Sequence, residues 1–515
     1  MKKYLVYCFI VCTQTVFGLD KNTLTDWTYA GKHTSYNNKT VSLAIKDFGG
    51  IADNKTNNAT ALNKAIAALN GKPGTIEFGS GFFLFTQPVS LPSFVKLVGQ
   101  GSDKTSLNFN LNGNSDAISV QGKPDTISSK IINGTQKEST QITVENAGNF
   151  AVHDYCIIKQ NASNLLNNDW AYNSFYQIVE ITAIKGNTIS IRSPMHLSFP
   201  AQPVLIKINP ATDVSIENLT IKRMDITNAQ TSTIFFNFAV NCNVSGVELS
   251  NSNYALINLQ SSAFCTISGN YLHHAFDYGS GGKGYGVVMQ FGATDNLIID
   301  NIAEHLRHSF LLQASSNGNV IAFNYSFDPY WKQGFFPSGA AGDIVLHGNY
   351  PYGNLFEGNI IQNLVIDNSH GINGPNNTFF RNRMESYGIF MNGNSGDNMN
   401  FYANEITGSG LLKGLYSLEG NHTEIANNIK GDLQSGTVSE KSLFNSSYFA
   451  KIGINNTYNS WTNEAFNRAK KGVKTSSKLL IGTVITQNNS DVSSAKYTST
   501  SKPKKKKCIK KKGKK

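Results

Sequence analysis

Short apolar runs recur through the middle of the chain at nearly equal distances. Nine strand-like segments between residues 213 and 430 end on a common position, and most steps between them are close to 23 residues, with three longer ones. Each unit contains two or three short stretches rich in Ile, Val, Leu and Phe, separated by Gly and Asn. This period leaves no room for a helix in each unit. It predicts an all-β protein, a right-handed parallel β-helix built as a single-stranded solenoid.

An asparagine ends the strand in most of these repeats. Asn tolerates the left-handed conformation of a sharp bend, and its amide can bond to the Asn of the next coil, about 4.8 Å away. We therefore interpret these residues as structural. Cys242 and Cys265 fall at one place in adjacent coils, which predicts that they pack inside as small apolar side chains. The corner asparagines are Asn218, Asn270, Asn301, Asn324, Asn359, Asn382, Asn404 and Asn427.

The strand before each corner predicts one exposed row of polar side chains. Strict alternation places residues such as Leu259, Met289 and Leu312 inside, so the residue that follows each of them lies outside. Seven successive coils would thus present a hydrogen-bonding side chain on one line, suited to an extended ligand. The predicted outward residues are Gln260, Gln290, Gln313, His347, Asn373, Asn392 and Glu419.

Segments outside this period define the other parts of the chain. Lys2 and Lys3 precede an apolar stretch, which predicts an export signal and a secreted, periplasmic or cell-surface protein. Residues 58–69 have apolar residues at helical spacing, and a helix there would cap the open end of the stack. The predicted parts are 1–18 signal peptide, 40–137 N-terminal cap and first coils, 138–207 inserted antiparallel β subdomain, 208–435 main β-helix, 436–501 C-terminal extension and linker, and 502–515 Lys-rich tail.

Composition and charge narrow the possible partners. The chain has 515 residues, of which 40% are hydrophobic and 15% charged, so it can bury a large core. The net charge is +11, and residues 502–515 alone contain ten lysines. The rest of the chain is therefore nearly neutral, and nucleic acid is not an expected partner. The tail is expected to be solvated, or to contact an anionic glycan or surface. No later run is apolar and long enough to span a bilayer, and we expect a monomer.

The N-terminal sequence resembles a known family. Residues 43–69, LAIKDFGGIADNKTNNATALNKAIAAL, followed by GKPGTIEFGSGFFLF and VKLVGQGSDKT, are similar to the opening of the pectate-lyase-like, rhamnogalacturonase/epimerase-like β-helix proteins. Ile51, Ala52 and Asn57 depart from the family pattern, and Gly79 stands where the family usually has Pro. The resemblance implies a polysaccharide substrate, often acidic, on the outward face of the parallel sheet. Family members include lyases, hydrolases, epimerases and tailspike-type binders, so the reaction stays open.

Six of the ten histidines lie between residues 273 and 370 and mark the candidate chemistry. Eliminative cleavage of a uronate needs a base and a cation that neutralises the carboxylate, which His347 or His308 with Arg307 would supply. Hydrolysis instead needs two facing carboxyl groups, for which Asp343 and Asp367 are candidates. A glycan-binding or structural protein without activity is the third possibility.

We predict a polysaccharide lyase in which His347 accepts the proton, Arg307 stabilises the developing charge, and His308 and Asp343 assist. Tyr330 and Trp331 lie on a loop together with Phe335 and Phe336, where they would either stack on sugar rings or pack over the coil as a small cluster. Ser369-His370-Gly371 is similar to the Gly-His-Gly of family hydrolases, but alternation predicts that His370 points inward. No cofactor or metal-ligand cluster is predicted, although Ca2+ stays open as a counter-ion for a uronate.

Overall fold

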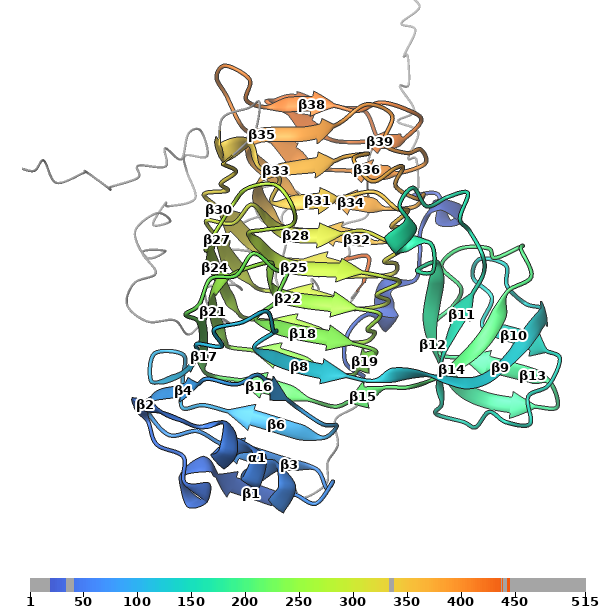
Figure 1. Ribbon diagram of the computed structural model, residues 1–515. Coiled ribbons are helices and arrows are strands. Elements are labelled where there is room, and N and C mark those ends of the chain that lie inside the picture. The colour runs from blue at the N-terminus through green and yellow to red at the C-terminus, as the bar shows by residue number, and fades with distance from the viewer. Residues whose placement is uncertain (1–18, 34–40, 333–337, 437, 439–441, 445–515) are drawn as a thin grey trace, which may run out of the picture. The chain divides into compact units, whose positions relative to one another are not determined.

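The computed structural model describes residues 19–33, 41–332, 338–436, 438 and 442–444 (Figure 1). Short parallel strands stack coil upon coil around one continuous apolar core, which confirms the parallel β-helix. The predicted signal peptide, most of the C-terminal extension and the Lys-rich tail lie outside the described residues. No helix among the described residues is long and apolar enough to cross a membrane.

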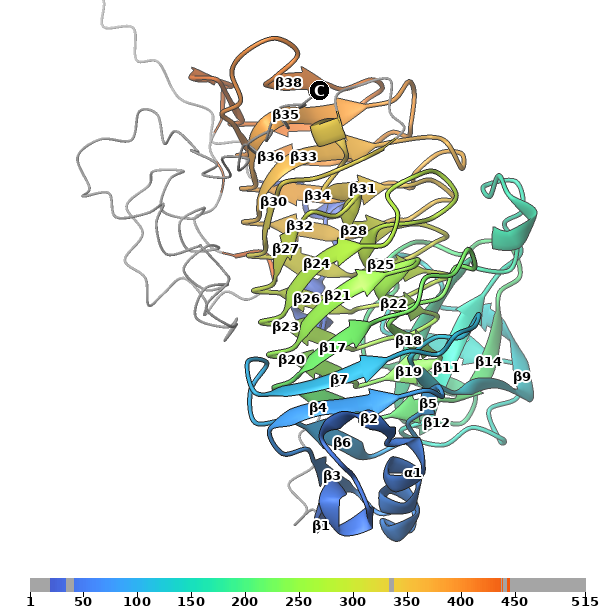
Figure 2. The ribbon, with the colours of Figure 1, turned by 60° about the vertical axis from the view of Figure 1, so that its left-hand side comes forward.

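The coils have three faces, each a parallel sheet (Figure 2). The strands of the first face are β1 (Val41–Ala44), β3 (Gly74–Glu77), β6 (Val95–Val98), β16 (Ser215–Glu217), β20 (Asn243–Ser245), β23 (Thr266–Ser268), β26 (Leu297–Ile299), β29 (Val320–Ala322), β32 (Leu355–Glu357), β34 (Thr378–Phe380), β36 (Asn400–Tyr402) and β39 (Thr423–Ile425).

The second face follows the first in each coil. Its strands are β2 (Asp53–Asn57), β4 (Gly81–Phe85), β7 (Thr105–Phe109), β17 (Thr220–Arg223), β21 (Glu248–Ser252), β24 (Tyr271–Ala275), β27 (Ile302–Glu304), β30 (Tyr325–Phe327), the first parts of β33 (Ile360–Ile366) and β35 (Arg383–Met391), β37 (Glu405–Ile406) and β40 (Asn428–Ile429), with β41 (Asp432–Leu433) antiparallel to β40.

The third face carries the predicted polar row. Its strands are β5 (Val89–Ser90), β8 (Ile118–Gln121), β18 (Ile234–Asn237), β22 (Ala255–Gln260), β25 (Tyr285–Gln290), β28 (His308–Leu312), β31 (Ile344–Leu346), the last parts of β33 and β35, and β38 (Leu415–Ser417). A further parallel pair is formed by β15 (Ala211–Thr212) and β19 (Ala239–Val240).

The corner asparagines form the predicted ladder. Each amide from Asn270 to Asn404 donates to the side-chain oxygen of the next Asn at 2.8–3.1 Å, and all of them are buried. The bend itself, however, is made by the residue before each Asn, for example Gly269 (φ 64°) and Asp300 (φ 59°). The expectation that Asn takes the left-handed conformation holds for Asn218 (φ 54°), which is not part of this ladder, and is wrong for the asparagines of the ladder. Their role is to satisfy backbone groups at the bend.

A second asparagine ladder lies five residues earlier and was not predicted. Asn296, Asn319, Asn354 and Asn377 are fully buried, and their amides are linked at 2.9–3.0 Å. In the preceding coil Cys265 holds the corresponding place, and its N–H donates to Asn296 Oδ1 at 3.0 Å. Cys242 and Cys265 are buried in the core as predicted.

The described part of the chain contains one α-helix, α1 (Ala59–Ala68), where helical spacing predicted it. Ala59, Leu62 and Ala65 of this helix pack into the coil core. That it shields the open sheet edge stays a prediction. Short 3-10 turns are η1 (Lys21–Thr23), η2 (Trp27–Tyr29), η3 (Ile45–Phe48), η4 (Asp169–Ala171) and η5 (Ser338–Ala340).

The predicted antiparallel insert is a closed six-stranded barrel. It begins before the expected boundary at residue 138, because the long first strand already belongs to it. The inward and outward residues of that strand alternate as they do in a strand of the coils, so its sequence did not mark the boundary of the barrel. The barrel strands are β9 (Lys123–Asn133), β10 (Gln141–Val144), β11 (Tyr155–Lys159), β12 (Tyr176–Lys185), β13 (Thr188–Ile191) and β14 (Val204–Asn209).

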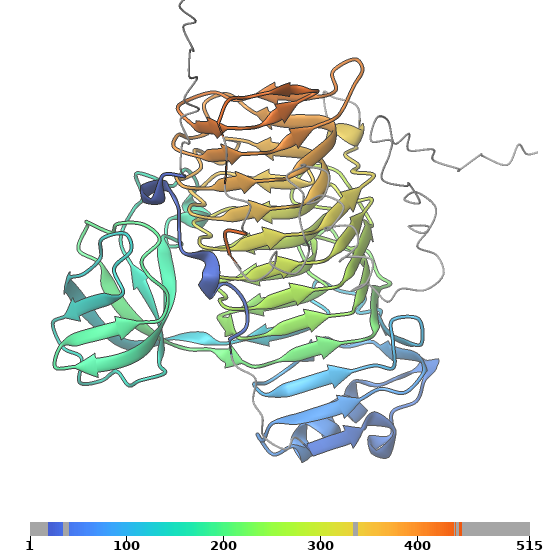
Figure 3. The same ribbon diagram turned by 180° about the vertical axis from the view of Figure 1, so that it is seen from behind.

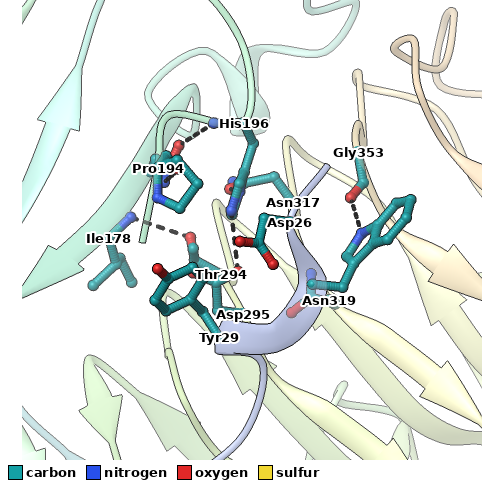
Figure 4. Close-up of polar contacts among 12 residues, drawn as sticks. Asp26, Tyr29, Ile178, Pro194, His196, Thr294, Asp295, Asn317, Asn319 and Gly353 are labelled. Atoms are coloured by element: carbon teal, nitrogen blue, oxygen red, sulfur yellow. Dashed lines mark hydrogen bonds and ion pairs between the residues drawn. The ribbon is translucent and has the colours of Figure 1, made fainter. Parts of the chain in front are cut away.

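A buried ion pair joins the barrel to the coils (Figure 4). His196 Nε2 lies 3.1 Å from Asp295 Oδ1, and neither side chain is exposed. His196 Nδ1 contacts Asn317 Oδ1 at 2.9 Å, so both ring nitrogens face acceptors. Burial by itself would lower the pKa of His196, but the charge and hydrogen bond of Asp295 raise it above the ordinary value. The ion pair therefore adds a polar contact to the apolar one that Ile157 and Ile178 of the barrel make with Ala263 and Phe264 of the coils.

Residues 20–32 form a strap along the coils (Figure 3). Thr23 O accepts from Asn400 Nδ2, Trp27 Nε1 donates to Gly353 O at 2.7 Å, and Gly31 N donates to Asp295 O at 2.8 Å. Trp27 is 1% exposed. Because its partners belong to different coils, the strap ties coils together that are distant in sequence.

Candidate functional site

The third face presents the predicted polar row on its outward side. Leu259, Met289, Leu312, Leu346 and Met391 lie in the core, so the residue after each points outward. Strand pairing aligns Gln260 with Gln290, and extending the register along the stack gives the row of Gln260, Gln290, Gln313, His347, Asp367, Asn392 and Glu419.

Asn373 does not belong to this row, contrary to the prediction. The strand of that coil is β33, whose Ile366 pairs with Leu346 and Met391 in the core, so Asp367 takes the outward place. Asn373 is 2% exposed and donates to the carbonyls of Asp367 and Ser395. It supports the turn after β33, and Ile372, predicted inside, is exposed.

The glutamines in the middle of the row bond to each other. Gln313 Nε2 donates to Gln290 Oε1 at 2.7 Å, and Gln290 Nε2 donates to Asn258 Oδ1 at 3.2 Å. Both glutamines are buried. Gln260 is half-buried, and Asn392 and Glu419 at the far end are exposed. Hydrogen bonds therefore connect the side chains at the centre of the row, whereas those at its far end are exposed to solvent.

His347 and Asp367 form a hydrogen-bonded pair in this row. His347 Nδ1 lies 2.7 Å from Asp367 Oδ2, and the side chains are 13% and 15% exposed. Asp367 also accepts from the Ser369 hydroxyl at 2.7 Å. Burial by itself would raise the pKa of Asp367, but the hydrogen bond and charge of His347, with the bonds from Ser369, lower it to about 2. His347 Nε2 bonds to no residue that the structure describes.

Arg307 lies nearby, sandwiched between two aromatic rings. Its guanidinium carbon is 5.7 Å from the ring centre of Tyr285 and 5.1 Å from that of Trp331. Nη1 donates to Gly279 O at 2.6 Å, whereas the buried Nε has no hydrogen-bond partner among the described residues. Arg307 is 8% exposed. A buried cation with an unused donor is costly unless a ligand supplies an acceptor.

The ring of His308 lies near both Tyr285, which contacts Arg307, and His347 of the His347–Asp367 pair. Its ring lies 5.1 Å from that of Tyr285 and 6.1 Å from that of His347. Burial and the charges of Arg307 and His347 lower the pKa of His308 well below its usual range. The neutral ring donates through Nδ1 to Gly342 O at 2.9 Å, which leaves Nε2 as an acceptor.

Asp343, predicted to assist catalysis, lies enclosed in the fold. Its carboxylate is fully buried and accepts from the Ser326 hydroxyl and from the backbone N–H groups of Gln362 and Asn363. Burial raises its pKa to about 6 despite these bonds. The structure thus encloses one carboxyl group of the predicted pair of Asp343 and Asp367, and a role of this pair in hydrolysis stays a prediction.

Two residues of the cluster were missed by sequence reasoning. Tyr285 begins β25 and is 4% exposed, and burial raises the pKa of its hydroxyl. His370, predicted to point inward, instead follows β33, and its ring lies 4.8 Å from that of His347. The similarity of residues 369–371 to Gly-His-Gly was the available signal for His370, and none was available for Tyr285.

The two predicted loop aromatics that the structure describes, Tyr330 and Trp331, are half-buried. Trp331 packs on Arg307, and the Tyr330 ring stacks on His305 at 4.9 Å. Phe335 and Phe336 lie outside the described residues. Within the part of the chain that the structure describes, no three His, Cys, Asp or Glu side chains are grouped so that they could hold a metal ion.

The family described as rhamnogalacturonase A/epimerase, pectate lyase-like matches residues 42–335. The chain belongs to this family. The matched residues of this rhamnogalacturonase/epimerase-like protein include the first coils, the barrel and the coil that carries Arg307 and His308. No curated protein matches the chain significantly.

Three solved structures are similar to this family member over part of its length. The tailspike gp49 of Pseudomonas phage LKA1 is 14% identical, with a TM-score of 0.47 over 71% of this chain and 60% of that one. The gp54 tailspike of Acinetobacter baumannii bacteriophage AP22, in complex with capsular saccharide, is 11% identical, with a TM-score of 0.42 over 78% and 69%. The Streptococcus pneumoniae adhesin PfbA is 13% identical, with a TM-score of 0.39 over 71% and 84%. The chain thus spans 60% of the length of the LKA1 tailspike.

Proposed function

We propose that this protein is an exported enzyme that cleaves a uronate-containing polysaccharide by β-elimination on the outward side of the third face. The observation that carries the proposal is the pairing of His347 with Asp367 at 2.7 Å beside the buried Arg307 cluster. Membership in a family named for polysaccharide-modifying enzymes supports the substrate class. The predicted export signal remains part of the proposal.

His347 suits the role of proton acceptor better than His308. The Asp367 carboxylate holds the His347 ring in one orientation and stabilises the charge that the imidazole acquires when it accepts a proton. His308 has no carboxylate partner of this kind and is a weak base because its pKa is lowered. These contacts support His347, the base predicted from the sequence, with Asp367 as its positioning residue.

Arg307 suits the uronate carboxylate. Its guanidinium carbon lies over the rings of Tyr285 and Trp331, and its buried Nε has no hydrogen-bond partner among the described residues. Arg remains charged at any working pH and binds a planar carboxylate in a fixed geometry. Neutralising the carboxylate makes the neighbouring C–H acidic enough for a histidine to remove its proton.

The proposed reaction balances with one catalytic base. His347 Nε2 removes the proton from C5 of the uronate, the C–H electrons form a C4–C5 double bond, and the C4–O glycosidic bond breaks. The departing oxygen takes the proton back from the His347 imidazolium, which regenerates the neutral ring. Hydrolysis is disfavoured because Asp343 is fully buried, which leaves Asp367 without the carboxyl partner predicted for it.

The test is incubation of the full chain with a panel of uronate and neutral polysaccharides. We expect the ultraviolet absorbance of unsaturated uronates and the reducing ends to rise together on one acidic polymer. His347→Ala should lower the rate by roughly 10²-fold or more, the usual contribution of a general base. His153→Ala, which removes an exposed histidine of the barrel, is the matched control and should leave the rate unchanged.

Other outcomes would replace this proposal. Reducing ends without unsaturated products would indicate hydrolysis. Exchange of the C5 proton with deuterated solvent, without chain shortening, would indicate epimerisation. Binding without either change would indicate a non-catalytic glycan-binding protein.

A further inference from the structure

We propose that Trp170, on the inserted barrel, is a sugar-stacking surface beside His347, so that the barrel takes part in polysaccharide recognition. The inference rests on the proposed function. It adds Trp170 to Arg307 as a second residue that recognises the polysaccharide. Its ligand is a pyranose residue of the polymer that neighbours the uronate held at Arg307.

Trp170 belongs to η4, between barrel strands β11 and β12, yet its ring contacts the third face. Its indole packs edge-to-face on Phe291 at 5.6 Å and on His370 at 5.5 Å. Phe291 directly follows Gln290 of the polar row, and the His370 ring lies 4.8 Å from that of His347. The indole therefore borders the polar row one ring away from the proposed base.

The loop that carries Trp170 is fixed to the coils by a buried asparagine. Asn349 Oδ1 accepts the backbone N–H groups of Asn167 and Asn168 at 2.8 and 3.2 Å, and its Nδ2 donates to Asn168 Oδ1 at 3.0 Å. His370 Nδ1 contacts the same Asn168 oxygen at 3.1 Å. Since these bonds order the loop in the free protein, a ligand would not have to bear that entropic cost on binding.

Trp170 is nevertheless 44% exposed, which is unusual for an indole that is held this firmly. Trp331, the other tryptophan near the cluster, is engaged by Arg307. Trp170 thus offers an exposed aromatic ring to a ligand. The C–H face of a pyranose packs well on such a surface, and the neighbouring His370 and Asn168 offer polar atoms to its hydroxyls.

The experiment compares Trp170→Ala, Trp170→Phe and the matched control Phe82→Ala in the full chain. Phe82 is also an exposed aromatic, but it lies on β4 in the N-terminal coils. On the polymer that the wild type cleaves, we expect Trp170→Ala to raise KM by about five- to tenfold, the value of one stacking contact, with kcat within about twofold. Trp170→Phe should recover most of the loss, and Phe82→Ala should match the wild type.

The possible results separate this inference from the proposed function. If the wild type cleaves and Trp170→Ala has the same KM and the same retention on the immobilised polymer, the inference is overturned and the function stands. If Trp170→Ala lowers the thermal midpoint and raises KM only near that midpoint, with wild-type KM at temperatures well below it, a structural role replaces the binding role. If the wild type neither binds nor cleaves any polymer of the panel, the proposed function and the inference are both overturned.

Discussion

Replacing Asn324 by Ala should destabilise the coils more than any exposed substitution. The Asn324 side chain is fully buried in the middle of the corner ladder. Its amide donates to Ile298 O at 2.9 Å and to Asn359 Oδ1 at 3.0 Å. Its oxygen accepts the backbone N–H and the amide of Asn301 at 3.0 and 2.9 Å.

The magnitude follows from the groups that would lose these partners. Asn359 and the Asn301 amide keep other hydrogen bonds, to the Asn324 backbone and to Ile267 O. The backbone N–H of Asn301 and the carbonyl of Ile298 lose a contact that no water can replace in a closed corner. At about 1–3 kcal/mol for each buried group left unsatisfied, we expect a loss of about 2–6 kcal/mol.

Urea unfolding followed by far-ultraviolet circular dichroism measures this loss. The control is Asn110→Ala, because Asn110 is exposed, and this variant should unfold at the wild-type midpoint. If Asn324→Ala also unfolded at that midpoint with an unchanged slope, the ladder would not stabilise the coils and the reasoning would be refuted.

Three further predictions concern the strap, a buried carboxyl and the proposed base. Trp27→Ala removes a 1%-exposed indole and its bond to Gly353 O, so limited proteolysis should cut residues 19–33 faster; unchanged cleavage would show that the strap does not depend on it. Burial raises the pKa of Asp343 to about 6, so the folded state binds its proton more tightly, and stability should fall by up to about 3 kcal/mol between pH 4 and 6. Asp343→Asn should flatten that part of the urea-midpoint profile, and a profile equal to that of the wild type would contradict the assignment. Asp367→Asn should lower kcat on the cleaved polymer by roughly 10²-fold or more because His347 loses its orienting carboxylate, whereas wild-type kcat would exclude Asp367 from the mechanism.

The sequence by itself determined the solenoid and much of the polar row. A coil buries its inward residues only on its neighbours, so the same pattern must return at each turn, and this makes the period visible. The positions of Met289, Leu312 and Leu346 in the core follow from local alternation alone, as do Gln290 and Gln313 outside it. The second ladder was also readable, since Asn296 stands five residues before Asn301, as Asn319 does before Asn324.

Register failed in the coil of β33, where the wrong run of residues was taken as the outward strand. β33 runs from Ile360 to Ile366 through the bend between the second and third faces, so its outward place falls on Asp367. The prediction assumed a separate strand around Ile372 and therefore chose Asn373. A short apolar run shows its alternation but not the residue at which the chain turns, because pairing with the neighbouring coil decides that.

Only the tertiary structure decided which polar groups act together. Asn168 on the barrel contacts His370 across 202 residues, and Trp170, two residues further on, packs against the same His370 ring. Likewise Asp343 and Asp367 have the same side-chain chemistry, but one is enclosed by backbone donors and the other faces an imidazole. Burial and partner geometry set the charge and access of each carboxyl group, and both arise from contacts between segments that no local pattern links.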